Sequence, residues 1–71
     1  MPRLKSLTGK QIIEILSHHG FLIVRQHASH VRLKHPDGRA TTVPIHRHEH
    51  VGRGLLRKII RDSKLKLSEF Q

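Results

Sequence analysis

The spacing of apolar residues predicts an amphipathic helix near the start of the chain. Its apolar residues recur at helical spacing, at Ile12, Ile13 and Leu16. Thr8 can cap the N-terminus of this helix, and Gln11, three residues later, completes a capping box. Gly20 suits the C-terminal end, because glycine readily adopts the left-handed conformation found there. We therefore expect the first helix over residues 9–19.

The middle of the chain is patterned as three short strands, Phe21–Val24, His30–Lys34 and Arg39–Val43. The first is a continuous apolar run, and the polar residues 26–29 are expected to end it. The second alternates polar and apolar residues, which gives a strand one wet face and one dry face. Residues 35–38 contain the proline and glycine of a turn. Pro44 is expected to end the third strand, because proline cannot donate a hydrogen bond to a sheet.

The last third of the chain is patterned as a loop followed by a second helix. Residues 45–53 are expected to form the loop, and Gly54 is expected to cap the helix. The apolar stripe of this helix comprises Leu55, Leu56, Ile59 and Ile60. Three further apolar residues are spaced to fold a final turn back onto the core: Leu65, Leu67 and Phe70.

The order of elements defines the expected fold class. An αβββα chain that buries both helical stripes on one antiparallel three-stranded sheet is an α+β fold backed by two helices. This arrangement leaves the other face of the sheet open. At 71 residues, the chain is expected to form one domain over residues 1–71.

Charge indicates the class of ligand for that open face. Lysine and arginine number 14 against five acidic residues, for a formal charge of +9. The positive charge is spread along the chain, so it belongs to a folded surface that attracts polyanions, of which nucleic acid is the obvious class. The two aromatic residues, Phe21 and Phe70, leave little for stacking on bases, so contacts are expected mainly to phosphate and sugar.

Composition also argues against several other classes of protein and of site. Without cysteine, the chain has neither a disulfide framework nor a thiolate metal site. No apolar run approaches the roughly 20 residues that span a membrane, and the first residues lack the apolar stretch of a secretory signal. We expect a cytoplasmic protein with no membrane partner.

The second strand carries the candidate chemistry. Its alternation places His30, Arg32 and Lys34 on one face, with Val31 and Leu33 pointing into the helices. Two cations can hold a phosphodiester and favour the negative charge that develops at phosphorus. An imidazole can take or give a proton at neutral pH. The alternative interpretation is that His30 is an ordinary exposed strand residue.

The histidine-rich loop can be interpreted as a candidate metal site. His46, His48 and His50 alternate along it, and Glu49 or His27 could complete a set of ligands. Structural zinc sites usually contain cysteine or fixed paired spacings, which are missing here. The local positive charge also opposes a divalent cation. We therefore expect no metal or other cofactor, and interpret the run as a polar loop near nucleic acid.

An ordered set of segments resembles the HicA family of bacterial toxins. After the first helix, these are Gly20–Phe21, Ala28–His30, His35–Gly38, Thr42–His46, the glycine-led helix 54–60 and Phe70. The match extends over almost the entire chain in the same order. The resemblance implies a fold like a double-stranded-RNA-binding domain, ribonuclease activity on messenger RNA, and inhibition by a HicB-type antitoxin.

The resemblance also assigns the site. Family members carry a Gly-Ser-His segment with a catalytic histidine, which corresponds here to His30. Ser29 of the same segment, with Arg32, Lys34 and His46, is expected to bind single-stranded RNA. Ala28 stands where the family commonly has glycine, and a positive φ there would strain an alanine. Two classes of function stay open, a metal-independent endoribonuclease and a non-catalytic RNA- or DNA-binding module.

Overall fold

The elements occur in the expected αβββα order, followed by one short 3-10 helix. The computed structural model describes residues 6–46 and 49–71. The elements are α1 (Gly9–His18), β1 (Leu22–His27), β2 (His30–Lys34), β3 (Ala40–Pro44), α2 (Arg53–Ser63) and η1 (Leu67–Phe70). The α+β prediction is therefore confirmed. No helix in the described part of the chain is long and apolar enough to cross a membrane.

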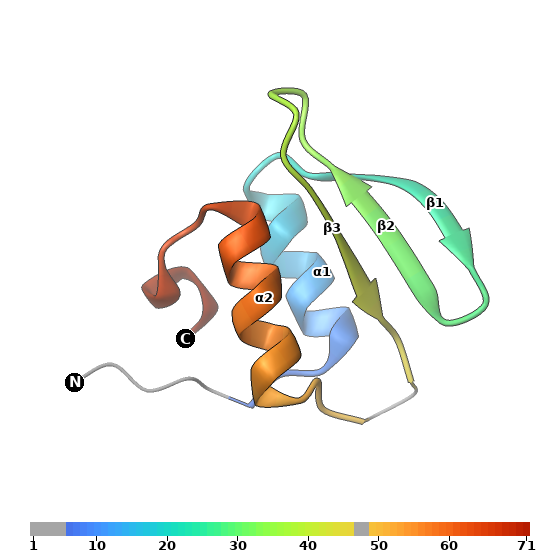
Figure 1. The fold of residues 1–71 in the computed structure, drawn as a ribbon, viewed down its shortest axis with the longest axis vertical. Helices are drawn as coiled ribbons and strands as arrows, with labels where there is room; N and C mark the ends of the chain where they lie inside the picture. Colours follow the sequence, from blue (N-terminus) through green and yellow to red (C-terminus); the bar gives the residue numbers. More distant parts are fainter. Residues whose placement is uncertain (1–5, 47–48) are drawn as a thin grey trace.

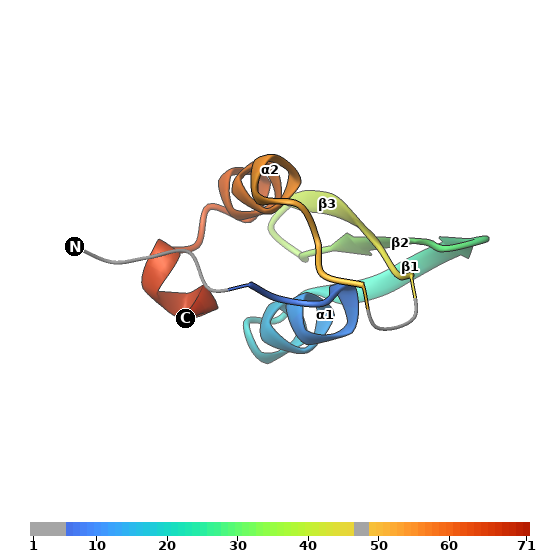
Figure 2. The same cartoon turned by 90° about the horizontal axis from the view of Figure 1, so that it is seen from below.

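The three strands form one antiparallel sheet in the order β1-β2-β3. The two helices lie together on one side of the molecule, next to β3, as Figure 1 shows. In Figure 2, seen from below, the β1–β2 hairpin extends away from both helices. The helices therefore cover β3 and one face of β2, and they leave β1 at an uncovered edge.

The core lies between the helices and the inward face of β2 and β3. From the sheet it takes Val31, Leu33, Thr41 and Val43, which are all at most 1% exposed. The helices contribute Ile12, Leu16, Leu56 and Ile59. Phe21 and Phe70 also belong to this core. Phe70 is fully buried, which confirms that the last turn folds back onto the core.

Helix α1 begins as the sequence predicts. The Thr8 side chain accepts a hydrogen bond from the Gln11 backbone N–H at 3.2 Å, and the Gln11 side chain accepts one from the Thr8 N–H at 2.9 Å. Gly9, the first helical residue, lies against the end of β3. A Cβ atom there would stand 2.0 Å from the Pro44 carbonyl oxygen, so this close approach requires glycine.

Predicted boundaries of β1 and α2 are wrong by two or more residues, and bounds of α1 and β3 differ from the prediction by one residue. Strand β1 starts after Phe21 and continues through the polar residues to His27, because those residues pair with β2. Helix α2 begins at Arg53 with Gly52 as its N-cap, so Gly54 lies within the first turn. Leu55 is 39% exposed, and the buried stripe of this helix therefore rests on Leu56 and Ile59.

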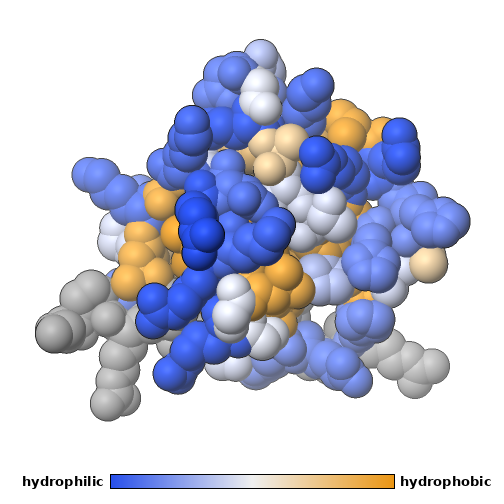
Figure 3. Space-filling model, in the orientation of Figure 1, coloured by the Kyte–Doolittle hydropathy of each residue, from blue (hydrophilic) through white to orange (hydrophobic). Residues whose placement is uncertain are grey.

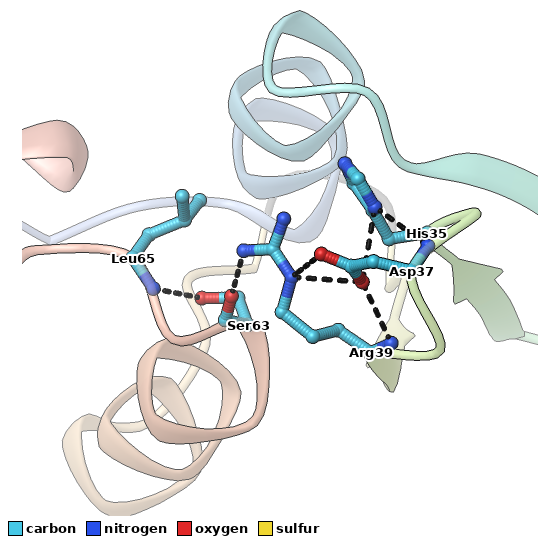
Figure 4. Close-up of polar contacts among 5 residues, drawn as sticks. All are labelled: His35, Asp37, Arg39, Ser63 and Leu65. Carbon is cyan, nitrogen blue, oxygen red and sulfur yellow. Dashed lines mark hydrogen bonds and ion pairs between the residues drawn. The ribbon is translucent and has the colours of Figure 1, made fainter.

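The turn between β2 and β3 is held by a polar network, drawn in Figure 4. The Asp37 carboxylate accepts hydrogen bonds from the Arg39 backbone N–H at 3.0 Å and from Arg39 Nε at 2.8 Å. Arg39 Nη1 donates to the Ser63 carbonyl oxygen at 2.6 Å, which ties the turn to the end of α2. The Arg39 guanidinium also lies 5.1 Å from the centre of the Phe21 ring.

Candidate functional site

The open face of β2 carries the three residues that the sequence placed there. His30, Arg32 and Lys34 are all exposed, and the intervening Val31 and Leu33 are buried. A strand with this alternation has one face in the core and one in solvent. The common face of His30, Arg32 and Lys34 is therefore confirmed.

Strand β1 adds two residues to the same face. Arg25 is the register partner of Arg32, and His27 is the register partner of His30. Residues directly opposite each other in an antiparallel pair project from the same face of the sheet. The sequence pattern does not indicate Arg25 and His27 at this site, because the apolar run that predicts the first strand ends at Val24.

A β-bulge is responsible for this placement. The pairing shifts between Ile23 and Arg25, so Val24 is the extra residue of the bulge. Simple alternation from Ile23 would have put Arg25 and His27 on the helix-facing side of the sheet. The bulge reverses that alternation and turns both toward the face of His30.

These side chains surround a shallow hollow of about 590 Å³ on the open sheet face. Its lining comes from all three strands: Val24, Arg25, His27, His30, Arg32, Lys34 and Thr42. Arg32 Nη1 donates a hydrogen bond to Thr42 Oγ1 at 3.2 Å, which orients the guanidinium across the sheet. The hollow therefore combines three cations with two imidazoles.

The cations of this hollow have no acidic partner in the part of the chain that the structure describes. Within residues 6–46 and 49–71, no carboxylate lies within ion-pair distance of Arg25, Arg32 or Lys34. Arg25 and Arg32 also face each other directly across the two strands. Like charges in that position repel at a cost of about 0.2–1 kcal/mol. A bound anion would relieve this repulsion, so the face is suited to a phosphate group.

The structure also brings the other expected residues to His30. Ile45 N–H donates a hydrogen bond to the Ser29 carbonyl oxygen at 2.6 Å, which ties the chain after β3 to the β1–β2 turn. Ser29 thus acts here through its backbone, and its side chain is only partly exposed. A second hollow, of about 500 Å³, joins His30 and Thr42 to His46, His50 and Leu55. Four of the expected residues thus line the two hollows, and His30 belongs to both.

The two-residue turn between the histidines has an unusual backbone. Ala28 has φ of 54°, a value in the left-handed region, whereas Ser29 is not among the positive-φ residues. A positive φ at the first central position alone is the sign pattern of a type II′ hairpin turn, which favours glycine there. Ala28 therefore has the positive φ at which an alanine is strained, by about 1–2 kcal/mol relative to an unstrained residue.

The histidine-rich loop gives no metal site within the described residues. In the parts of the chain that the structure describes, no three histidine or acidic side chains are close enough to share a metal ion. His48, one member of the expected set, lies outside the described residues. His50 is engaged elsewhere, because its Nδ1 is hydrogen-bonded to the Ser6 hydroxyl.

Most of the surface seen in Figure 3 is hydrophilic, with separate apolar patches. The fold and the cationic, histidine-bearing sheet face together define a small α+β protein with a surface suited to polyanions. The family model described as HicA toxin of bacterial toxin–antitoxin matches residues 9–65 of the 71-residue chain. The chain therefore belongs to the HicA toxin family, which confirms the resemblance seen in the sequence. No curated protein sequence matches it.

Membership of this family defines the biological context. HicA proteins are the toxins of bacterial toxin–antitoxin systems, so an antitoxin is the expected partner of this chain. The matched region begins with helix α1 and ends just after helix α2. It therefore includes every strand and both hollows described above.

Proposed function

We propose that the protein is a metal-independent endoribonuclease that cleaves messenger RNA with His30 as its catalytic residue. The observation that carries the proposal is the position of His30 in a hollow that also contains Arg25, Arg32 and Lys34. These cations have no carboxylate partner among the described residues, so an RNA phosphate can supply the missing negative charge.

The chemistry follows from the groups present. The cations bind the scissile phosphate and stabilise the additional negative charge that forms on it in the transition state. RNA carries its own nucleophile, the 2′-hydroxyl of the ribose whose 3′-oxygen is bonded to the scissile phosphorus. His30 exchanges a proton with the reacting oxygens, as imidazoles do at neutral pH. Ser29 precedes His30 in the chain, and His46 shares the second hollow with His30, so both extend the proposed RNA-binding surface.

The same face is also the proposed site of inhibition. We infer that a HicB-type antitoxin with an acidic surface covers the cations around His30. Charge complementarity with Arg32 and Lys34 makes such an association fast. The antitoxin would then exclude RNA by occupying the place of its phosphates, and it would stabilise the folded toxin by binding only that state.

The test is RNA cleavage by the purified protein in the presence of a chelator. Wild-type protein should cleave single-stranded RNA, and His30→Ala should lower the rate by about 10²–10⁴-fold, the usual contribution of an acid–base group. His18→Ala, which removes an exposed histidine from the far end of α1, is the matched control and should cleave normally.

Two results would contradict the proposal. Cleavage that stops when chelator is added would show that a metal ion is required. A His30→Ala protein that binds RNA and cleaves it at the wild-type rate would remove His30 from the chemistry. Wild-type protein that binds RNA without cleaving it would identify the second class of function, a non-catalytic RNA- or DNA-binding module.

A further inference from the structure

The face around His30 contains a second histidine that the sequence pattern did not place there. His27 ends β1 and His30 begins β2, and the two are register partners on either side of the Ala28–Ser29 turn. Directly opposite residues of an antiparallel pair have Cβ atoms about 4.5–5.5 Å apart. Both side chains are exposed and both line the same hollow.

The turn between the two histidines holds them in this relation. A two-residue connection leaves no room for the register of His27 and His30 to slip. The bond from Ile45 N–H to the Ser29 carbonyl oxygen, at 2.6 Å, fixes the turn to the body of the protein. Backbone strain of the kind found at Ala28 persists where the surrounding structure imposes it, and it occurs often at functional sites.

Cleavage of RNA by its own 2′-hydroxyl requires two proton transfers. The 2′-oxygen forms a bond to phosphorus and gives up its proton, while the bond between phosphorus and the 5′-oxygen breaks and that oxygen takes a proton. The products are a 2′,3′-cyclic phosphate and a 5′-hydroxyl. One imidazole can accept the first proton and one imidazolium can donate the second, so two adjacent histidines balance the reaction without a metal ion.

We propose that His27 is a second catalytic residue and that His27 and His30 divide these two proton transfers between them. The proposal rests on the proposed ribonuclease function and adds to it the second proton-transfer group. After one turnover the two rings have exchanged protonation states, and solvent restores them because both are exposed.

Other charged and titratable groups surround the pair. Within the hollow itself these are Arg25, Arg32 and Lys34. Of the two histidines, only His30 lines the second hollow. That hollow is also lined by His46, Glu49, His50 and Lys58.

The test compares pH–rate profiles of wild-type protein, His27→Gln and His27→Arg on the same single-stranded RNA. One group acting as base and one as acid give the wild-type protein a bell-shaped profile. His27→Gln should lower the maximal rate by about 10²-fold or more and remove one limb of the bell. His18→Gln, on α1, is the matched control and should keep both limbs.

His27→Arg separates proton transfer from simple phosphate binding. Arginine keeps a positive charge at this position but does not release a proton in proteins. We expect His27→Arg to be as slow as His27→Gln. If arginine restores the rate, His27 is only a phosphate contact and the proposal is wrong.

A substrate with an activated leaving group sharpens the assignment. A uridine 3′-(p-nitrophenyl phosphate) expels p-nitrophenolate without needing a proton. Of His27→Gln and His30→Gln, the variant that lacks the acid should recover most of its rate on this substrate, and the variant that lacks the base should stay slow. Loss of rate on both substrates in both variants would mean that neither ring donates the proton, which overturns the proposal.

The two proposals fail in different ways. A His27→Gln protein with wild-type rate and both limbs, in a preparation where His30→Gln is inactive, rejects the role of His27 and leaves the proposed function intact. A uniform fall in rate with both limbs kept would show that His27 only supports the structure, and this also rejects its catalytic role. An inactive wild-type protein rejects the proposed ribonuclease function itself.

Discussion

The two turns of the sheet are built in opposite ways. The turn between β2 and β3 is held by the Asp37 carboxylate, and Arg39 ties it to the Ser63 carbonyl oxygen at the end of α2. The turn between β1 and β2 has no side-chain hydrogen bond among the described residues, and it contains a strained Ala28. The cations on the strands beside it, Arg25 and Arg32, have no carboxylate partner among the described residues, whereas Arg39 has one at 2.8 Å.

The difference shows where this small protein places its polar interactions. In the turn between β2 and β3, charged groups pair with each other and contribute to stability. Beside the turn between β1 and β2, Arg25 and Arg32 have no carboxylate partner among the described residues and repel each other, and a bound anion relieves this repulsion. The turn between β2 and β3 ties the sheet to the end of α2, and the strands beside the other turn leave their charges available to a ligand.

The largest effect on stability should come from Arg39→Ala. This change removes a charged hydrogen bond to the Ser63 carbonyl oxygen, worth about 1.5–3 kcal/mol of unfolding free energy. Urea unfolding followed by circular dichroism measures the loss. Arg25→Ala, on β1 near the other turn, is the matched control, with an expected change within about 0.5 kcal/mol. Equal losses in the two variants would show that the two turns do not differ as described.

Glycine and alanine exchanges should have opposite signs in the two turns. Ala28→Gly relieves about 1–2 kcal/mol of left-handed strain and loses roughly 0.5–1 kcal/mol of chain entropy, so it should stabilise the protein by up to about 1 kcal/mol. Gly38 has φ of 104° with open space around it, so Gly38→Ala should destabilise by about 1 kcal/mol through backbone strain alone. Thermal unfolding of both variants tests this, and a destabilised Ala28→Gly would contradict it.

The smallest expected effect is on the stability of the protein at acidic pH. The hydrogen bonds from Arg39 hold the pKa of the Asp37 carboxyl below its usual value of 3.8. A carboxyl with a lowered pKa in the folded state adds stability above about pH 4, and this contribution disappears as the pH falls through the folded-state pKa. Wild-type protein should therefore be more stable than Asp37→Asn at pH 7, with the gap narrowing below about pH 4. Unfolding titrations between pH 7 and 3 measure this gap, and a constant gap would refute the assignment.

Local patterns predicted the parts of the fold that local interactions determine. The capping box at Thr8 and Gln11 set the start of α1, and the alternation of His30–Lys34 set both the bounds and the faces of β2. In each case the residues that carry the signal also make the contacts. The position of His30 on an exposed sheet face followed from the alternation, and the fold class followed from the order of all the elements.

The remainder of the site depends on how the strands pair, which the pattern of a single strand does not reveal. Arg25, Gln26 and His27 carry little strand preference of their own, and they are extended because β2 supplies a partner. The bulge at Val24 then decides which face they occupy, and no residue of a continuous apolar run marks where a bulge falls. The start of α2 was missed for a similar reason, because Gly52 and Gly54 are equally acceptable caps by composition.

The uncovered edge of the sheet affects the handling of the isolated protein. Leu22, Ile23 and Val24 are between 56% and 61% exposed on a strand with one free side. Free strand edges with apolar side chains favour edge-to-edge association and aggregation. The bulge at Val24 and the charge on Arg25 interrupt the flat edge that such aggregation needs. Concentrated preparations should therefore stay clear longest at low salt, where repulsion between the positively charged chains is screened least.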